Sequence, residues 1–440
     1  MEFTNTEKLY EIFLLHPQVC TDTRNVQKGS IFFALKGANF NGNVFAKEAM
    51  LKGAAYVVVD EIQETKSEKF IFVEDALTAL QNLAQYHRKK LGQKKLKVLA
   101  LTGSNGKTTT KELIARVLSK KFKTHFTSGN LNNHIGVPLT LLQLNESHEI
   151  AVIEMGANHQ KEIEFLCAIT EPDFGLITNV GMAHLEGFGG PQGVLLGKTE
   201  LFSNLSKNGG FAFVMSDDLR LLERAGTLAK QTYGTNNDAT IKGNLIEANP
   251  FVVFEWQGNG ISKHAVRTQM IGDYNFMNLI AACAVGNYFE IDEKEIDDAI
   301  ASYVPDNNRS QLIKCGTNTL VLDAYNANPS SMIAAIDNLA RMKNEKKIII
   351  LGDMFELGEE STYQHQQIVN LIAEKIPAAT LLLVGELFSK TKYKYNSIKF
   401  SDSKSAASWI GINFPSNSLI LIKGSRGMKM ERCADVLMNI

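Results

Sequence analysis

The sequence has little net charge, few cysteines and no long apolar run, and each of these shortages excludes a class of protein. Its 46 basic and 47 acidic side chains leave a formal net charge of −1, so no broad basic field exists to hold a nucleic-acid backbone. The five cysteines are odd in number and form no Cys-x-x-Cys pair, which argues against a disulfide framework or a zinc site and fits a reducing compartment. No stretch approaches the roughly 18 apolar residues that span a bilayer, and the first residues lack the pattern of a signal peptide. We therefore expect a cytoplasmic globular protein that binds neither nucleic acid nor membranes.

Short apolar runs alternate with helical patterns along the 440 residues, a length that favours about three domains. In the first segment, apolar runs at 31–35 and 56–59 precede a helical pattern between Asp75 and Leu91. A short polar stretch follows this pattern. Together these features predict a small α/β domain at residues 1–93.

The rest of the chain predicts two mostly parallel sheets, in a central domain at 94–309 and a C-terminal Rossmann-like domain at 310–440. In both, apolar runs typical of buried strands alternate with helical patterns, and 232–267 is predicted to be an antiparallel addition to the central sheet. The apolar runs of the last domain lie at 320–322, 348–351, 381–384 and 419–422. Since open α/β sheets bind ligands beyond the carboxyl ends of their strands, we expect binding residues just after these runs. The predicted fold class is thus α/β with three domains.

The strongest motif, TGSNGKTTT at 102–110, lies between an expected strand and an expected helix. Its glycines let backbone N–H groups approach phosphate oxygens, its lysine reaches the outer phosphates, and the hydroxyl after the lysine binds Mg²⁺. Only two residues separate the glycines, fewer than in the general G-x-x-x-x-G-K-[ST] loop, and an ordinary glycine turn before a helix is the alternative interpretation. The candidate nucleotide ligands are Gly103, Ser104, Asn105, Gly106, Lys107, Thr108 and Thr109.

Two further strand ends favour nucleotide chemistry. Glu154 follows the apolar run 150–153, and His184 follows a run that ends near Val180. In a parallel sheet both side chains can lie near the phosphate loop, where a carboxylate is a natural Mg²⁺ ligand and an imidazole a less common one. Taken alone, His184 has the equally good interpretation of a surface or capping residue.

The TGSNGKTTT string resembles the ATP loop of the Mur ligase family, and the resemblance extends over the whole chain. It implies that ATP binds the central domain and that Glu154, His184 and a carbamylated Lys198 take part in binding Mg²⁺. It also implies that Asn275 lies at the adenine, Arg309 near the γ-phosphate, and Asp323 at the nucleotide from the third domain. Without the resemblance, Lys198 would be taken as a solvated helix lysine and Arg309 as a surface arginine.

The flanking domains are similar to those of the family members that add D-alanyl-D-alanine. The segments TDTR at 21–24 and GSIFFALKG at 29–37 resemble a UDP-binding region, although NFNGN at 39–43 departs from the usual pattern. The polar segments GNLNNHIGVP at 129–138 and YNANP at 325–329 also match. By this resemblance the candidate substrate ligands are Thr23, Arg24, Lys36, Asn132, Asn133, Tyr325, Asn326 and Asn328. Loop charges and a polar loop are the simpler interpretations.

The reaction implied by the resemblance is amide ligation through an acyl phosphate. ATP phosphorylates a carboxylate of a UDP-muramoyl tripeptide, and an amine, here D-alanyl-D-alanine, displaces the phosphate. The candidate catalytic residues are Lys107, His184, Lys198 and Arg309. We expect a monomer with small-molecule partners. The alternatives are a folylpolyglutamate synthetase or another Mur ligase, a P-loop switch or motor ATPase, and an inactive muramoyl-peptide binder.

Overall fold

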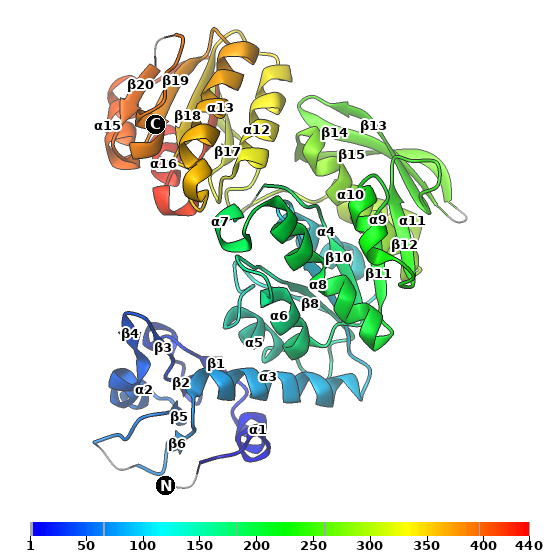
Figure 1. Cartoon of the computed structure of the whole chain (residues 1–440), viewed down its shortest axis with the longest axis vertical. Coiled ribbons are helices and arrows are strands. Elements are labelled where there is room, and N and C mark those ends of the chain that lie inside the picture. The colour runs from blue at the N-terminus through cyan, green and yellow to red at the C-terminus, as the bar shows by residue number, and fades with distance from the viewer. Residues whose placement is uncertain (1–2, 65–66, 183, 259–260, 396, 440) are drawn as a thin grey trace.

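The computed structural model describes residues 3–439 except 65–66, 183, 259–260 and 396. The three α/β parts follow one another along the long axis of the molecule, with the central part between the other two (Figure 1). Each part is built on its own main sheet, so the expected three-domain α/β architecture is confirmed. Among the described residues, no helix combines the length and apolar character that crossing a membrane requires.

The first part is a parallel sheet of four strands in the order β1-β2-β5-β6. Its strands are β1 (Val19–Cys20), β2 (Ile31–Phe33), β5 (Tyr56–Val59) and β6 (Phe70–Phe72), with a small hairpin of β3 (Lys36–Gly37) and β4 (Phe40–Asn41). Its helices are α1 (Thr6–Leu15), α2 (Ala46–Leu51) and α3 (Ala76–Gly92). Helix α3 begins where the Asp75 carboxylate accepts a hydrogen bond from the Thr78 N–H at 2.7 Å, a typical N-cap. Its far end packs on the central part, where Arg88 pairs with Asp173 at 2.9 Å (Figure 1).

The central part has nine strands in the order β15-β14-β13-β12-β11-β10-β7-β9-β8. The parallel strands are β7 (Lys97–Thr102), β8 (Thr124–Phe126), β9 (Ile150–Glu154), β10 (Phe174–Ile177), β11 (Phe211–Met215) and β12 (Lys230–Gly234). The predicted antiparallel addition is present as β13 (Ile241–Ala248), β14 (Phe251–Gly258) and β15 (Ile261–Ile271). Val98 and Ala100 face one core and Leu99 and Leu101 the other, because successive strand residues point to opposite faces.

Helices cover both faces of this central sheet. One face carries α5 (Gly136–Leu141), α6 (Glu162–Thr170), α7 (Leu185–Phe188), α8 (Pro191–Asn208) and α9 (Leu219–Ala225). The other carries α4 (Lys107–Leu118), α10 (Phe276–Tyr288) and α11 (Glu293–Ala301). Strands buried on both faces explain why their sequences are continuous apolar runs.

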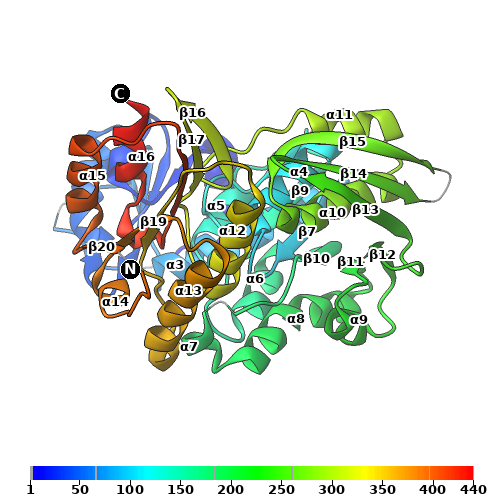
Figure 2. The same cartoon turned by 90° about the horizontal axis from the view of Figure 1, so that it is seen from above.

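The third part is a six-stranded sheet in the order β16-β17-β21-β18-β19-β20, parallel except for β16. Its strands are β16 (Gln311–Cys315), β17 (Asn318–Asp323), β18 (Lys347–Gly352), β19 (Thr380–Val384), β20 (Ser397–Phe400) and β21 (Leu419–Lys423). Helices α12 (Pro329–Arg341) and α13 (Ser361–Lys375) pack on one face, and α15 (Ser403–Ile412) and α16 (Glu431–Met438) on the other, with α14 (Glu386–Ser389) beside β19 (Figure 2). This is the expected doubly wound layout. The carboxyl ends of β17 and β21 face those of β7 and β9 across a single cleft.

Candidate active site

A cleft of about 840 Å³ lies between the central and third parts. Of the predicted phosphate-loop residues, six line it: Ser104, Asn105, Gly106, Lys107, Thr108 and Thr109. Further predicted residues on its walls are Asn132, Asn133, Glu154, His184 and Asn275. The junction and the third part contribute Arg309, Asp323, Tyr325, Asn326 and Asn328. Candidates that are more than 200 residues apart in the chain are thus brought to one place.

The phosphate loop needs glycine at both of its ends. Gly103 has φ +146°, and a Cβ there would lie 2.0 Å from the Thr178 hydroxyl. Gly106 has φ +78°, caps the start of α4, and a Cβ there would meet the Asn278 amide oxygen at 2.6 Å. Both positions therefore exclude a side chain by conformation and by space. Gly103 itself lies beneath the cleft and acts through its backbone.

The loop is fixed to the residues that follow β10. The Thr178 hydroxyl donates to the Asn105 carbonyl at 2.6 Å, and the Asn105 N–H donates to the Asn179 side chain at 3.0 Å. The Ser104 hydroxyl accepts from the Gly181 N–H at 2.9 Å. Thr178 and Asn179 were not predicted, although Asn179 follows an apolar run just as Glu154 does. These bonds hold the loop in one shape, so it is preorganised for a ligand.

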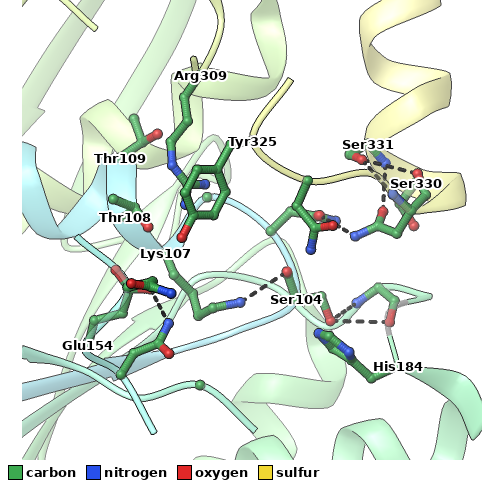
Figure 3. A pocket seen from close by; sticks show the side chains of 18 of the residues that line it. Ser104, Lys107, Thr108, Thr109, Glu154, His184, Arg309, Tyr325, Ser330 and Ser331 are labelled. Atoms are coloured by element: carbon green, nitrogen blue, oxygen red, sulfur yellow. Dashed lines mark hydrogen bonds between the residues drawn. The ribbon is translucent and has the colours of Figure 1, made fainter. Parts of the chain in front are cut away.

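Lys107 lies at the floor of the cleft, between Glu154 and Ser104 (Figure 3). Its ammonium group donates to the carbonyls of Gly103 at 2.7 Å and Ser104 at 3.2 Å. Burial lowers the pKa of Lys107, the nearby Glu154 carboxylate raises it, and the Arg309 guanidinium lowers it further. Two cations in a shielded cleft repel each other, and this environment favours an anion between them.

Glu154 offers one free carboxylate oxygen. The side chain is 1% exposed, and its Oε1 accepts a hydrogen bond from the Asn132 amide at 2.8 Å. Its Oε2 is buried and has no hydrogen-bond partner among the described residues. A buried anionic oxygen is costly unless a cation or donor meets it, so this atom indicates a cation site. Thr108, whose hydroxyl is a type of oxygen that such an ion accepts as a ligand, lines the same cleft.

His184 forms an ion pair across the two parts. It adopts the left-handed conformation with φ +54°, and its Nδ1 contacts the Glu356 carboxylate of the third part. The close approach of His184 lowers the pKa of Glu356, while burial opposes this shift. Since Glu356 is also in the left-handed region, at φ +64°, both partners stand on unusual backbone, a feature that concentrates at functional sites.

Lys198 does not line the cleft directly. Its side chain is 1% exposed, its ammonium group donates to the Ala157 carbonyl at 3.1 Å, and it lies 4.9 Å from the centre of the Phe188 ring. Burial, with a smaller contribution from Lys107, holds the pKa of Lys198 well below its usual range. Because Ala157 is part of the cleft wall, Lys198 lies one residue layer behind it.

Arg309 stacks on Tyr325 at the opposite wall. Its guanidinium carbon lies 3.6 Å from the ring centre, and its buried Nε has no hydrogen-bond partner among the described residues (Figure 3). Behind it, Asp323 pairs with the buried Lys423 at 2.5 Å and accepts from the Ser310 N–H at 3.3 Å. The stacking fixes the direction of Arg309 while leaving N–H donors for a ligand.

Asn275 lines the cleft but is largely buried, and both polar atoms of its side chain are bonded within the protein. Its amide nitrogen donates to the Ile271 carbonyl at 2.9 Å, and its oxygen accepts from Asn278 at 3.0 Å. Asn278 in turn accepts from the Thr110 hydroxyl at 3.0 Å. The two asparagines therefore connect α10 to the start of α4.

The first-part candidates lie outside this cleft. Arg24 pairs with Asp22 at 2.5 Å. Thr23 is the first residue of the short 3-10 helix η1 (Thr23–Asn25), which also contains Arg24. Lys36 lies 3.2 Å from Asp60 and 3.6 Å from Glu61. The structure thus separates Thr23, Arg24 and Lys36 from the phosphate loop.

The comparisons with known proteins agree with this layout. Three family models match: "Mur ligase family, catalytic domain" at 18–88, "Mur ligase middle domain" at 101–286 and "Mur ligase, glutamate ligase domain" at 308–426. The UDP-N-acetylmuramoyl-tripeptide–D-alanyl-D-alanine ligase of Bacillus subtilis (strain 168) is 35% identical over 434 residues, covering 96% of this chain and 93% of that protein.

Solved structures extend the similarity to three dimensions. MurF from Acinetobacter baumannii superposes with a TM-score of 0.86 at 31% identity, over 96% of this chain and 93% of that chain. MurF from Thermotoga maritima, solved in complex with ADP, gives 0.84 at 27% identity, over 97% and 98%. With a phosphate loop, a buried carboxylate and a third α/β part meeting at one cleft, and with this similarity along nearly all of its length, the chain belongs to the Mur ligase family.

Proposed function

We propose that this chain is an ATP-dependent ligase that joins D-alanyl-D-alanine to UDP-N-acetylmuramoyl-tripeptide in peptidoglycan precursor synthesis. The observation that carries the proposal is the meeting of the Lys107 loop with a wall from the third part that holds Tyr325, Asn326 and Asn328. The choice of substrates is supported by relatives that bear that enzyme name and are similar to this chain over nearly their whole length. The products are UDP-muramoyl-pentapeptide, ADP and phosphate.

The proposed chemistry passes through an acyl phosphate. A carboxylate oxygen of the tripeptide attacks the γ-phosphorus of ATP, and ADP leaves. The dipeptide amine then attacks the acyl carbon, expels inorganic phosphate and releases a proton. Lys107 and Arg309 hold positive charge on opposite sides of the transferring group, where it stabilises the charge that develops. The third part closes over the loop and restricts water, which would otherwise hydrolyse the intermediate.

The cleft fits Mg²⁺ as the accompanying ion. Glu154 Oε2 is a free buried anionic oxygen, Thr108 supplies a hydroxyl, and His184 supplies an imidazole on another wall of the same cleft. Bound there, Mg²⁺ would neutralise phosphate charge. The low pKa of Lys198 leaves its amine unprotonated more often, and only that form reacts with CO₂ to give the anionic carbamate. We extend the proposal to a carbamylated Lys198 that supports the metal site from behind Ala157.

The remaining assignments follow the same proposal. Asn275 helps to shape the adenine end of the nucleotide site, Asp323 its third-part side, and Asn132 and Asn133 the peptide side of the cleft. Thr23, Arg24 and Lys36 bind the UDP group in the first part, where Arg24 and Lys36 supply exposed positive charge. The domains at 1–93, 94–309 and 310–440 then bind the UDP group, ATP and the dipeptide, respectively.

The proposal also covers compartment and oligomeric state. The five free cysteines suit a cytoplasmic enzyme, and one chain forms the described cleft, as a monomer requires.

A panel of substrates tests the function directly. The purified chain is incubated with ATP, Mg²⁺ and D-alanyl-D-alanine together with one of several UDP-muramoyl peptides, and products are identified by mass spectrometry. We expect a pentapeptide product only with a tripeptide acceptor and only while EDTA is absent. Product formation from folate and glutamate, or rapid ATP hydrolysis that needs no amine, would contradict the proposal.

A further inference from the structure

The wall that the third part contributes to the cleft carries a basic side chain beside an exposed aromatic one. Arg426 begins the short 3-10 helix η5 (Arg426–Met428), and Phe355 lies in the loop after β18; both line the cleft with Asn326. Phe355 is 43% exposed, although phenylalanine side chains are usually buried. A cation, an amide and an exposed ring together suit a small ligand that has one anionic end and an apolar body.

Arg426 differs from the other lysines and arginines of the cleft. Lys107 donates to loop carbonyls, Lys423 is paired with Asp323 at 2.5 Å, and Arg309 stacks closely on Tyr325. The side chain of Arg426 is 62% exposed, and its ion pair with Glu431 is long, at 3.7 Å, beyond hydrogen-bond distance. Among the lysines and arginines that line the cleft in the described structure, Arg426 is the exposed one, so its charge is available to a second ligand besides the one at Lys107 and Arg309.

Local contacts fix Arg426 relative to Phe355. The Ser425 hydroxyl accepts a hydrogen bond from the Phe355 N–H at 2.9 Å, and the Ser425 N–H donates to the Asp353 carbonyl at 3.1 Å. Gly427 lies so close that a Cβ there would be 2.9 Å from the Phe355 ring. The β18 loop and the turn at 425–428 therefore form one preorganised surface.

Arg426 lies within a dipeptide's length of the Arg309 side of the cleft. The guanidinium carbons of Arg309 and Arg426 lie 3.6 and 5.6 Å from the centre of the same Tyr325 ring, so they are at most 9.2 Å apart. An extended dipeptide, which spans roughly 7 Å, can reach from one guanidinium group to the surroundings of the other. A dipeptide held at Arg426 by its carboxylate can direct its amine toward Arg309 and the phosphate loop.

We propose that Arg426 binds the terminal carboxylate of the dipeptide substrate and that Phe355 contacts its methyl groups; this inference rests on the proposed function. A guanidinium binds a carboxylate through two parallel hydrogen bonds, which gives direction as well as affinity. Arg426 thereby selects dipeptides, in which the carboxylate of the second residue can bind Arg426 while the amine of the first residue reacts. The nucleotide and the UDP substrate contact other parts of the chain.

A neutral substrate tests this role. Rates are measured for D-alanyl-D-alanine and for D-alanyl-D-alaninamide, with wild type, Arg426→Gln and Arg426→Lys. Wild type should prefer the acid, and Arg426→Gln should raise the KM for the acid about ten- to a hundredfold, the scale of one hydrogen bond to a charged group. The variant should use acid and amide almost equally, with the KM for ATP unchanged. Arg426→Lys should keep part of the preference.

Arg432→Gln is the matched control, because Arg432 is an exposed arginine a few residues further on that does not line the cleft. It should behave as wild type. A wild type that uses acid and amide equally, or an Arg426→Gln variant that keeps the preference, overturns the inference while leaving the proposed function intact. An increase in the KM for ATP or for the UDP substrate alone also overturns it, since Arg426 then serves another ligand. Absence of product from wild type with either dipeptide means that the proposed function has failed, and the inference with it.

Discussion

Lys107, Arg309 and Glu154 show how single side chains define the cleft by charge. Lys107 and Arg309 repel each other, and Glu154 partly offsets this repulsion, as the opposing effects on the pKa of Lys107 indicate. Neither cation forms an ion pair with a carboxylate in the described structure, unlike Lys423 with Asp323. A polyphosphate between them would relieve the repulsion, so the charges of the site complement a nucleotide rather than each other.

Replacing Lys107 tests this charge arrangement. Lys107→Met should lower kcat/KM for ligation about 10²–10³-fold, the usual effect of removing one preorganised charge from a transition state. The melting temperature should stay near that of wild type. The variant loses the hydrogen bonds from Lys107 to the Gly103 and Ser104 carbonyls, but it also loses the cost of burying a charge. Lys120→Met, at an exposed lysine beyond the end of α4, is the control and should retain full activity. A Lys107→Met enzyme with wild-type turnover would remove the phosphate loop from the mechanism.

The phosphate loop requires a left-handed backbone conformation at Gly106, where helix α4 begins. Gly106→Ala should weaken ATP binding and lower the free energy of unfolding by about 1–3 kcal/mol, because alanine disfavours φ +78° and its Cβ meets Asn278 at 2.6 Å. Gly209→Ala is a close match: it has φ +70° after α8, with nothing within 4 Å of the added Cβ. Calorimetry and nucleotide titration should show a smaller stability loss and unchanged binding for Gly209→Ala. Equal effects from both variants would mean that the contact with Asn278 is unimportant.

Helix α13 supplies a buried histidine whose protonation should oppose folding. His365 donates from Nδ1 to the Ser361 carbonyl at 2.6 Å and accepts at Nε2 from the Met354 N–H at 3.0 Å, so its neutral form is the one that fits. Burial lowers its pKa, with smaller opposing effects from Ser361 and Asp353. The unfolded chain, with a histidine pKa of about 6.5, binds this proton more readily than the folded one. Stability contributed here is therefore full above that pH and is lost as the pH falls below it.

Thermal melting between about pH 7.5 and pH 5 tests this prediction near the titration range of histidine. Wild type should lose melting temperature on acidification, and His365→Gln should lose less per pH unit, although its melting temperature at neutral pH is lower. Burial also lowers the pKa of His87, His125 and His148, so part of the pH dependence should remain in the variant. Identical pH dependence in both proteins would show that His365 does not titrate on unfolding.

The strands show which parts of the structure the sequence can predict. β7, β9, β17 and β21 were expected because a strand buried on both faces needs a continuous apolar run. β16 and β20 lie at the edges of their sheet, are partly exposed and mix polar with apolar residues, so no such run marks them. Edge strands are defined mainly by their neighbour's hydrogen bonds, which a local pattern does not contain.

The same limit applies to the site. The phosphate loop is local, and its spacing alone indicates a helix N-terminus that binds anions. The partners of the site residues are distant in sequence: Thr178 and Asn328 bind Asn105 of the loop, and Glu356 pairs with His184. None of these pairs follows from spacing, because each depends on how two sheets meet. The resemblance makes Asn328 a candidate substrate ligand, but it does not predict the contact of Asn328 with Asn105 or that of Glu356 with His184.

Three contacts between the central and third parts fall on predicted nucleotide or metal residues or beside them, and Arg341 adds an ion pair with Asp273 at 2.7 Å. The Asn328 amide donates to Asn105 at 2.8 Å, the Met182 N–H donates to Ser330 at 3.3 Å, and Glu356 pairs with His184. The phosphate loop therefore contacts the docked third part directly, through Asn105. Since interfaces within one chain resemble transient interfaces, we expect ligand binding and closure to be coupled, with hinges near Gly92 and Arg309.

Asn328→Asp separates this coupling from folding. Asn328 also caps α12, where its side-chain oxygen accepts from the Ser331 N–H at 2.9 Å, and aspartate retains that bond. It loses the N–H donor to Asn105 and places an oxygen against an oxygen, so the variant should be more open in small-angle scattering and have a higher KM for ATP. Ser331→Ala weakens the same cap without touching Asn105, and should reduce stability while leaving the scattering profile as in wild type. If Asn328→Asp instead scatters as wild type does and binds ATP normally, the hydrogen bond between Asn328 and Asn105 does not hold the two parts together, and closure depends on the ligands or on other contacts, such as Glu356 with His184 and Arg341 with Asp273.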